Sequence, residues 1–263
     1  MLTITPIPAL DSNYFWVIQP KDTAELAYVV DPGDATPVME YLTLHKLRLG
    51  GILITHRHRD HIQGVDELVK HWPVPVYGPK SEHIPQITHI VKEGDVVDLD
   101  GLLLKVIEVP GHTWEHIAYF GDSPSRSAPI LFCGDALFAG GCGRRFDGTA
   151  EIMWNSLQAL AALPETTQIY CAHEYTEANL AFAVEVEPNN QALKTRFAQV
   201  KLARAQGQIT LPSNILLEKR TNPFLRCQQT GIKIFAERET LKQLDNAAEV
   251  FGALRSIKDS WPK

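Results

Sequence analysis

A short apolar stretch that runs directly into a histidine cluster restricts the fold of this chain more than any other feature. Residues 50–55, GGILIT, have the length and composition of a buried strand, and residues 56–61, HRHRDH, follow at once. After the cluster, apolar residues recur at the intervals of a helix, at Ile62, Val65, Leu68, Val69 and Trp72. The cluster therefore lies on a strand-to-helix loop, the position where α/β folds gather ligands.

The same strand-then-turn pattern repeats over the first two thirds of the chain. Apolar runs such as LAYVV, LLLKVIEV and APILFC end at glycine, proline or aspartate, which predicts strands. TPVMEYLTLHKL (36–47) and EIMWNSLQALAALP (151–164) have helical spacing, and TQIYCAH (167–173) is predicted as the final strand. Residues 176–207 and 239–259 are rich in helix-forming residues. We therefore expect an α/β domain at 1–173 and a mainly helical domain at 174–263.

Composition excludes several classes of protein. With 44% hydrophobic and 21% charged residues, the 263-residue chain is typical of a globular protein. Its net charge of −6 argues against a nucleic-acid binder, which needs a basic surface. No apolar run reaches the ~18 residues of a membrane helix, and the N-terminus does not have the pattern of a secretory signal. We expect a cytoplasmic monomer with no membrane partner, whose four cysteines are reduced and mostly buried.

Metal binding is the first functional hypothesis for the cluster. The chain has 10 histidines in 263 residues, so three histidines within six positions far exceed a chance density. A solvated polar loop is the plain alternative, but imidazole and carboxylate together are ligands for zinc, iron and manganese. His56 and His58, two apart at a strand end, can point to the same side. Asp60 and His61 are adjacent, so their side chains diverge and can hold a second ion.

Three further candidate ligands each follow an apolar strand: His112 in VPGHTWEH, Asp135 in LFCGDALF and His173 in YCAHEY. Each is weak alone, because such residues often bond only to the backbone of their own turn. Together they predict a two-metal hydrolytic centre. One ion is assigned to His56, His58 and His112, the other to Asp60, His61 and His173, and Asp135 lies between them. We expect two divalent ions, zinc first and iron or manganese as alternatives, with Cys133 and Cys171 as core residues.

The motif T-H-x-H-x-D-H followed by single His, Asp and His resembles the metallo-β-lactamase superfamily. This resemblance implies a four-layered αβ/βα sandwich with metals at one edge. Other segments are similar to one branch, glyoxalase II (hydroxyacylglutathione hydrolase): IPALDSNYFWVI, VVDPGDATPV, GDALFAGGCGRRFDGTAEIM, CAHEYTEANLAFAVEVEPNN, TNPFLR and LRSIKD. That branch hydrolyses S-D-lactoylglutathione to glutathione and D-lactate, the second step of methylglyoxal detoxification.

The resemblance also implies roles for individual residues. Asp60 orients a metal-bound hydroxide, and the substrate-binding positions are Arg144, Phe146, Tyr175, Arg255 and Lys258. Arg255 and Lys258 are three apart, so a helix places both on one face, where they can meet a substrate carboxylate. Without the resemblance, a solvated basic face is the better interpretation of this pair. We expect His116 to have a structural role rather than a catalytic one.

Four positions depart from the commonest pattern of the branch. Arg57 replaces a frequent histidine, Glu115 a glycine and Ala136 a threonine. Phe146 stands where some relatives carry tyrosine, so a hydroxyl contact to substrate is lost there. None of the four changes removes a predicted ligand.

Three other functions stay open on sequence alone. A persulfide dioxygenase of the same superfamily holds one iron. A nuclease fits poorly with the acidic net charge. In a metal-binding module without catalysis the ions only stabilise the fold, so removing metal would unfold the chain.

Overall fold

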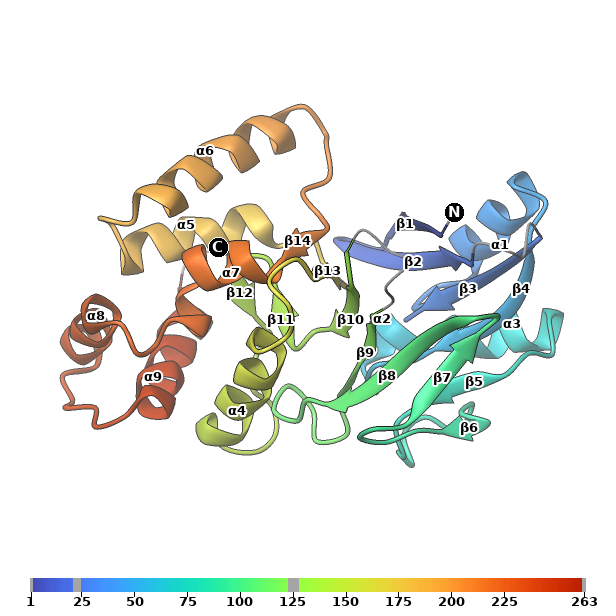
Figure 1. Cartoon of the computed structure of the whole chain (residues 1–263), viewed down its shortest axis with the longest axis horizontal. Helices are drawn as coiled ribbons and strands as arrows, with labels where there is room; N and C mark the ends of the chain where they lie inside the picture. The colour runs from blue at the N-terminus through green and yellow to red at the C-terminus, as the bar shows by residue number, and fades with distance from the viewer. Residues whose placement is uncertain (1, 21–24, 123–127, 262–263) are drawn as a thin grey trace. The chain divides into compact units, whose positions relative to one another are not determined.

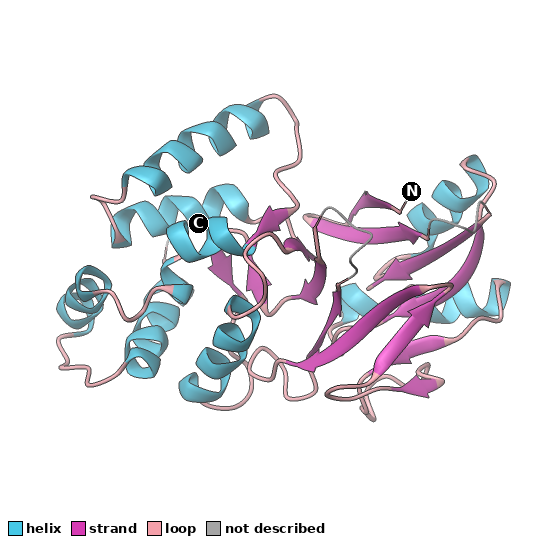
Figure 2. Ribbon diagram, viewed as in Figure 1, coloured by secondary structure: helices cyan, strands magenta, loops and turns pink. Residues whose placement is uncertain are grey.

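The computed structural model describes residues 2–20, 25–122 and 128–261, which divide into two units (Figures 1 and 2). The first unit is Met1–Glu108 with Glu115–Gly134, and the second is Val109–Trp114 with Asp135–Lys263. The sequence-based division at residue 173 followed the change in composition. The two units are instead defined by contacts in the folded chain, and these place the segment from Asp135 onward with the C-terminal helices.

The first unit contains a mixed six-stranded sheet whose strands lie in chain order (Figure 1). Its strands are β1 (Thr3–Ala9), β2 (Asn13–Gln19), β3 (Leu26–Val30), β4 (Arg48–Leu53), β5 (Val76–Gly78) and β6 (His89–Ile90). β1 to β3 pair antiparallel, whereas β3 to β6 pair parallel. Parallel neighbours need crossover connections. The β3–β4 connection contains α1 (Ala35–Leu44), and the β4–β5 connection contains α2 (Arg59–Ile62) and α3 (Val65–His71).

The helices α1 and α3 share one hydrophobic core with this sheet. Val38 and Leu42 of α1 and Leu68 of α3 are fully buried in it with Ile52 of β4. α1 begins where the Asp34 side chain accepts a hydrogen bond from the Thr36 backbone N–H at 2.9 Å. The helical spacing that predicted α1 thus reflects its buried face.

A second set of strands in the first unit is antiparallel throughout. It runs β7 (Val96–Leu99), β8 (Leu102–Glu108), β9 (Ile117–Gly121) and β10 (Ile130–Gly134). Residues of β9 contact the chain just after β4: the Ile117 N–H donates to the Thr55 carbonyl at 3.0 Å, and the Tyr119 hydroxyl to the Ile54 carbonyl at 2.9 Å. These bonds hold the start of the histidine loop.

The second unit is mainly helical. Two short antiparallel strand pairs, β11 with β12 and β13 with β14, accompany its helices. In chain order the elements are β11 (Leu137–Phe138), β12 (Gly141–Cys142), α4 (Ala150–Ala161), β13 (Gln168–Cys171), α5 (Thr176–Val186), α6 (Gln191–Ala205), β14 (Ser213–Asn214), α7 (Ile215–Thr221), η1 (Pro223–Leu225), α8 (Thr230–Thr240) and α9 (Ala247–Asp259).

One expectation for this part of the chain needs correction, and the two helix-rich stretches are each divided. β13 is followed by the two-residue strand β14, so TQIYCAH is not the final strand. The helix-rich residues 176–207 contain two helices, because Asn190 caps a new one by accepting from Leu193 N–H at 3.1 Å. Over 239–259, α8 ends at Thr240, where Leu241 adopts a positive φ of 54°, and α9 begins only after the Asn246 cap.

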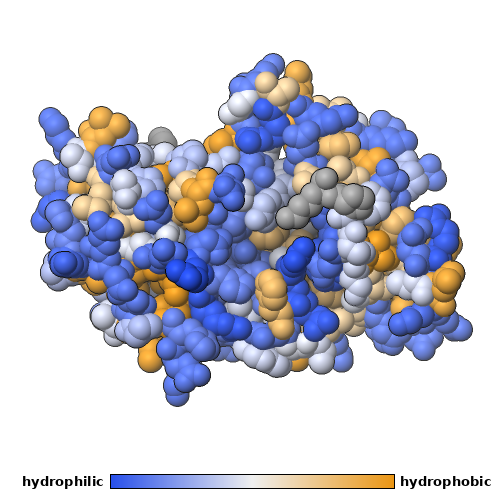
Figure 3. Space-filling view, turned by 180° about the vertical axis from the view of Figure 1, so that it is seen from behind, coloured by the Kyte–Doolittle hydropathy of each residue, from blue (hydrophilic) through white to orange (hydrophobic). Residues whose placement is uncertain are grey.

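Two surface properties bear on partners. None of the helices in the described part of the chain has the length and apolarity that crossing a bilayer requires. On the face drawn in Figure 3, hydrophobic residues lie in small separate groups among hydrophilic ones. The expectation of a monomer stays a prediction.

Candidate metal centre

The histidine loop of the first unit gathers imidazoles within one short connection. β4 ends at Leu53, and α2 begins at Arg59, so the loop is the predicted strand-to-helix connection. His56 Nε2 lies 3.0 Å from His58 Nδ1, and the ring centroids of His56 and His61 are 4.1 Å apart. His61 Nε2 lies 3.4 Å from Asp60 Oδ2. The structure thus brings together the four ligands that were predicted from this loop.

Asp31 determines which ring nitrogen carries the proton in two of these histidines. This role of Asp31 was not predicted from the sequence. Its Oδ2 lies 3.0 Å from His61 Nδ1 and accepts from the Thr55 hydroxyl at 2.6 Å. A carboxylate only accepts, so His61 carries its proton on Nδ1. The Thr55 hydroxyl, having donated to Asp31, accepts from His56 Nδ1 at 3.1 Å. Both rings therefore keep the Nε2 lone pair for a metal.

Asn13 supports Asp60 and was also missed. Its Nδ2 donates to Asp60 Oδ2 at 3.0 Å and to the Asp60 carbonyl at 3.3 Å. Asn13 is buried at the start of β2. The segment DSNYF contributed to the resemblance, but only the fold shows which side chain it holds.

Gly134 and His116 close the other side of this loop. His116 is fully buried, stacks on the His56 ring at 4.6 Å and 13°, and donates from Nδ1 to the Ile117 carbonyl at 3.0 Å. Gly134 has φ +48°, and a Cβ there would lie 2.3 Å from Thr55 Oγ1. Only glycine fits this position without displacing the hydroxyl that bonds to Asp31.

Two of the departures from the family pattern bond to each other. Arg57 Nη1 forms an ion pair with Glu115 Oε2, and the Arg57 N–H donates to Glu115 Oε1 at 3.1 Å. The side chains are 25% and 11% exposed, so the pair is only partly screened by water. The acidic residue at 115 thus balances the arginine that lies between two predicted ligands.

The second unit contains the other three predicted ligands, a carboxylate with an imidazole on each side. Asp135 Oδ2 lies 3.4 Å from His112 Nε2, and Asp135 Oδ1 lies 3.3 Å from His173 Nε2. All three residues are buried. His112 Nδ1 donates to the Arg144 carbonyl at 2.7 Å, which leaves Nε2 as the lone-pair nitrogen. One carboxylate with an oxygen toward each imidazole has the arrangement of a bridging ligand.

Two predicted substrate-binding aromatics flank these imidazoles. The Tyr175 ring stacks on His173 with centroids 4.7 Å apart and planes 3° apart. Phe146 meets His112 edge to face at 5.3 Å and is 57% exposed. Both present a surface to solvent beside a predicted ligand.

The three predicted cations differ in their surroundings. Arg255 is buried and already bound: its Nη1 donates to the Cys142 carbonyl at 3.0 Å, and its Nε and Nη2 donate to Asp259 Oδ1 at 3.1 and 2.9 Å. Arg144 Nε lies 3.5 Å from the same Asp259 oxygen. Sequence reasoning missed Asp259, although it follows Lys258 directly.

Lys258 lies over the Phe182 ring and donates to the Ala178 carbonyl at 3.1 Å. Burial, with the nearby Arg255 charge, lowers the pKa of Lys258 to about 8. The lysine therefore changes its charge close to neutral pH.

The donor set fits divalent metals of the zinc, iron and manganese kind. Each unit offers imidazole Nε2 atoms beside carboxylate oxygens, and Asp31, His56 and His61 have ligand atoms within 4.8 Å of one another. The cysteines are not part of this set of metal-binding groups. All four are buried, and burial raises the pKa of the Cys142 thiol to about 11 and of the Cys171 thiol to about 12, so these two stay protonated.

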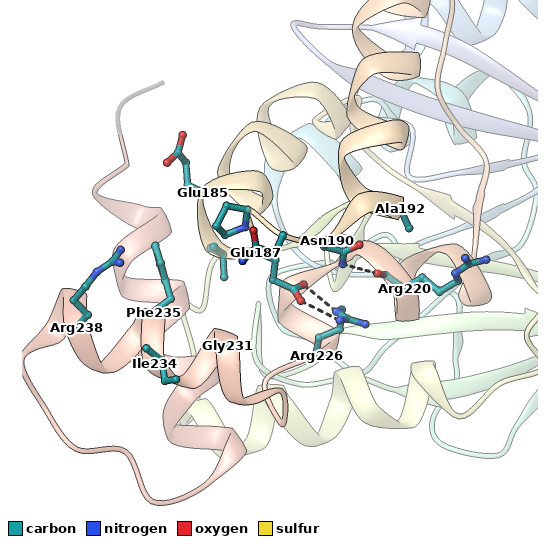
Figure 4. Close-up of a pocket in the computed structure, with 13 residues that line it drawn as sticks. Glu185, Glu187, Asn190, Ala192, Arg220, Arg226, Gly231, Ile234, Phe235 and Arg238 are labelled. Atoms are coloured by element: carbon teal, nitrogen blue, oxygen red, sulfur yellow. Dashed lines mark hydrogen bonds and ion pairs between the residues drawn. The ribbon is translucent and has the colours of Figure 1, made fainter.

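A separate hollow of about 630 Å³ lies on the second unit and includes none of the predicted site residues (Figure 4). At its centre Arg226 Nε and Nη2 donate to Glu187 at 2.9 Å each. Glu187 belongs to the segment EVEPNN, and Arg226 to TNPFLR. These two segments of the resemblance therefore meet in a structural ion pair.

Comparisons with known proteins agree with this geometry. The metallo-beta-lactamase superfamily profile matches residues 8–173, and the profile of the hydroxyacylglutathione hydrolase C-terminus matches residues 174–261. A protein of Aliivibrio fischeri strain ES114 named hydroxyacylglutathione hydrolase is 50% identical over 262 residues, which is 99% of this chain and 100% of the relative. A protein of the same name from Photobacterium profundum is 49% identical, with the same coverage.

The solved structures add the fold. The crystal structure of ETHE1 from Myxococcus xanthus has a TM-score of 0.65 at 23% identity and covers 98% of each chain. The expected fold class is confirmed: a metallo-β-lactamase-type αβ/βα sandwich followed by a helical C-terminal domain. Since relatives of one name match at about half of the positions over the whole length, this chain belongs to the hydroxyacylglutathione hydrolase family of the metallo-beta-lactamase superfamily.

Proposed function

We propose that this chain hydrolyses S-D-lactoylglutathione to glutathione and D-lactate. The observation that carries the proposal is the match of residues 174–261 to the hydroxyacylglutathione hydrolase C-terminus, because the metal motif alone is shared by enzymes of very different substrates. The rival assignments as a persulfide dioxygenase or a non-catalytic module do not account for full-length similarity to proteins with the hydrolase name. The cytoplasmic location and the monomeric state remain parts of the proposal.

Two divalent ions, zinc first, are proposed as cofactors. One would bind His56, His58 and His112, and the other Asp60, His61 and His173, with Asp135 serving both. The protonated Nδ1 atoms of His56, His61 and His112 support this, because each ring keeps Nε2 for a metal. When bound, the ions supply Lewis acidity: they lower the pKa of a water molecule and polarise the thioester carbonyl.

The residues of the chain then position the reactants. The Asp60 carboxylate, held by Asn13, accepts a hydrogen bond from the attacking water and orients it toward the thioester carbon. The water loses one proton to solvent and its oxygen forms the new C–O bond. As the tetrahedral intermediate collapses, the C–S bond breaks and the glutathione thiolate leaves. A thiolate leaves without prior protonation, so no side-chain acid is required at this step.

Glutathione binding is assigned to the second unit. Lys258 binds a substrate carboxylate, and Arg144 and Tyr175 line the same site. Phe146 contributes an apolar surface without a hydroxyl. Arg255 acts mainly through Asp259 and the Cys142 carbonyl, because its donors are directed there.

The deciding experiment combines turnover with metal analysis. The purified protein should hydrolyse S-D-lactoylglutathione, seen as loss of thioester absorbance, and contain two metal ions per chain. Oxygen uptake with glutathione persulfide and a single iron would instead support the dioxygenase.

Chelation separates the hydrolase from the non-catalytic module. During gradual removal of metal, turnover should disappear before the far-ultraviolet circular dichroism changes. Simultaneous loss of both signals would contradict a catalytic role for the ions.

A further inference from the structure

The β11–β12 hairpin joins a predicted metal ligand to a predicted substrate residue, because Asp135 precedes it and Arg144 follows it. Side chains from four separate places in the second unit bind its backbone. Asn179 Nδ2 donates to the Ala139 carbonyl at 3.2 Å, and Glu218 Oε2 accepts from the Gly140 N–H at 2.8 Å. Asn222 Nδ2 donates to the Gly141 carbonyl at 2.9 Å and to the Phe138 carbonyl at 3.3 Å. Arg255 Nη1 donates to the Cys142 carbonyl at 3.0 Å. Each residue from Phe138 to Cys142 thus has a backbone group held by a side chain.

Glu218 is the centre of this arrangement. It is fully buried, and its Oε1 accepts from Arg196 Nη2 at 2.6 Å and from the Ser213 hydroxyl. Its Oε2 accepts from Asn222 Nδ2 at 3.1 Å as well as from the hairpin. Arg196 is also buried and donates to Thr221 at 2.6 Å. Buried charges held by this many bonds keep one geometry, because every alternative leaves a polar group without its bond.

The hairpin is packed directly onto the metal ligands of the same unit. The Gly143 N–H donates to the Ala136 carbonyl at 3.4 Å, and a Cβ on Gly143 would lie 2.0 Å from the Asp135 carbonyl oxygen and 2.8 Å from His112 Nδ1. The next carbonyl, that of Arg144, accepts from His112 Nδ1. A shift of the hairpin therefore moves both the backbone of Asp135 and the acceptor that orients His112.

We infer that Glu218 and Asn222, supported by Arg196, are positioning residues for the metal centre. They act through the hairpin, which sets Asp135 and the orientation of His112. The inference rests on the proposed function for the presence of metal, and it gives the C-terminal helices a role in metal binding besides that in glutathione binding.

The test removes the buried pair without leaving a lone charge. Arg196→Met combined with Glu218→Leu replaces both charges with apolar groups of similar size, which avoids an unpaired buried charge. The acceptor for Gly140 N–H is lost. We expect a folded protein with a lower unfolding midpoint in urea, because the Ser213 hydroxyl, Asn222 Nδ2 and Gly140 N–H lose an acceptor. The Zn²⁺ dissociation constant should be about 10- to 100-fold higher, measured by competition with a chromophoric chelator. The visible spectrum of the Co²⁺-loaded protein should also change, since it reports ligand geometry.

A matched control exists in the same unit. Arg226 and Glu187 also form a two-bond ion pair between elements, and Arg226 Nη1 bonds to the Lys219 carbonyl rather than to the hairpin. Arg226→Met with Glu187→Leu should therefore keep the wild-type Zn²⁺ affinity and Co²⁺ spectrum. Equal weakening in both double variants would overturn the inference, because it would assign the effect to general loosening.

Asn222→Ser is a second test of the inference, which can be used if the first double variant does not fold. Serine keeps an oxygen that can cap the Phe224 N–H, as Asn222 does at 3.0 Å, but loses the amide donor to the hairpin. Weaker Zn²⁺ binding with intact folding supports the inference, and wild-type Zn²⁺ affinity and Co²⁺ spectrum overturn it. If the wild type itself does not hydrolyse S-D-lactoylglutathione, the proposed function fails alone, since the Zn²⁺ titration is read independently of turnover.

Discussion

Lys258 should make substrate capture depend on pH in a range where an ordinary lysine would not. Its pKa is lowered to about 8, first by burial and then by the charge of Arg255. Because the folded-state pKa lies below the usual value, the positive charge is present below pH 8 and is lost as pH rises through 8. The protonated fraction falls about tenfold between pH 7 and pH 9 for a pKa of about 8. We expect kcat/KM for S-D-lactoylglutathione to fall by a similar factor.

The change should lie in KM, because the cation contacts a part of the substrate that does not react. At saturating substrate the bound carboxylate keeps Lys258 protonated, so kcat should vary less than kcat/KM over the same range. Lys258→Met should raise KM about 10- to 100-fold at pH 7, which corresponds to the roughly 1.5–3 kcal/mol of a hydrogen bond to a charged group.

Initial rates from pH 6.5 to 9.5 on wild type, Lys258→Met and Lys258→Arg would test this. Arginine stays charged over the whole range, so the step near pH 8 should vanish in Lys258→Arg and in Lys258→Met. If all three proteins share one alkaline decline, the decline belongs to another group and Lys258 is not a substrate ligand.

Three other experiments test the site. His173→Ala should deplete one metal ion and sharply lower turnover; normal metal content and rate would remove His173 from the site. Asp31→Asn should weaken Zn²⁺ binding about 10- to 100-fold, because the amide no longer orients His61 as a carboxylate does, and chelator competition would measure it. Glu115→Gly should destabilise the chain more than Glu115→Gly combined with Arg57→His. The two substitutions should have a coupling energy of about 1 kcal/mol in urea unfolding, and additive effects would contradict the ion pair.

Much of the metal-site architecture could be predicted because strand ends are visible in sequence. GGILIT before the histidines and APILFC before Gly134 and Asp135 end where the structure turns from a strand into a loop. Local chemistry at each end then indicated a ligand. The helical C-terminal part was also predictable, because its composition favours helices.

The supporting residues could not be predicted, because their partners are distant in sequence. Asp31 reads as part of an Asp-Pro-Gly turn, and only the parallel pairing of β3 with β4 brings it to Thr55 and His61. Glu218 lies 78 positions from Gly140, so no local pattern connects them. Composition indicated helix without marking the boundaries at Asn190 and Asn246, where an asparagine cap begins a new helix.

The bond between Arg57 and Glu115 has an evolutionary consequence. A change at either position alone would leave a charge without its counterpart beside the imidazoles, so intermediates with one change are disfavoured. Among homologues, we therefore expect arginine at 57 to occur with an acidic residue at 115, and histidine at 57 with glycine. The two positions would then be substituted together during evolution, although they lie nearly sixty positions apart in the sequence.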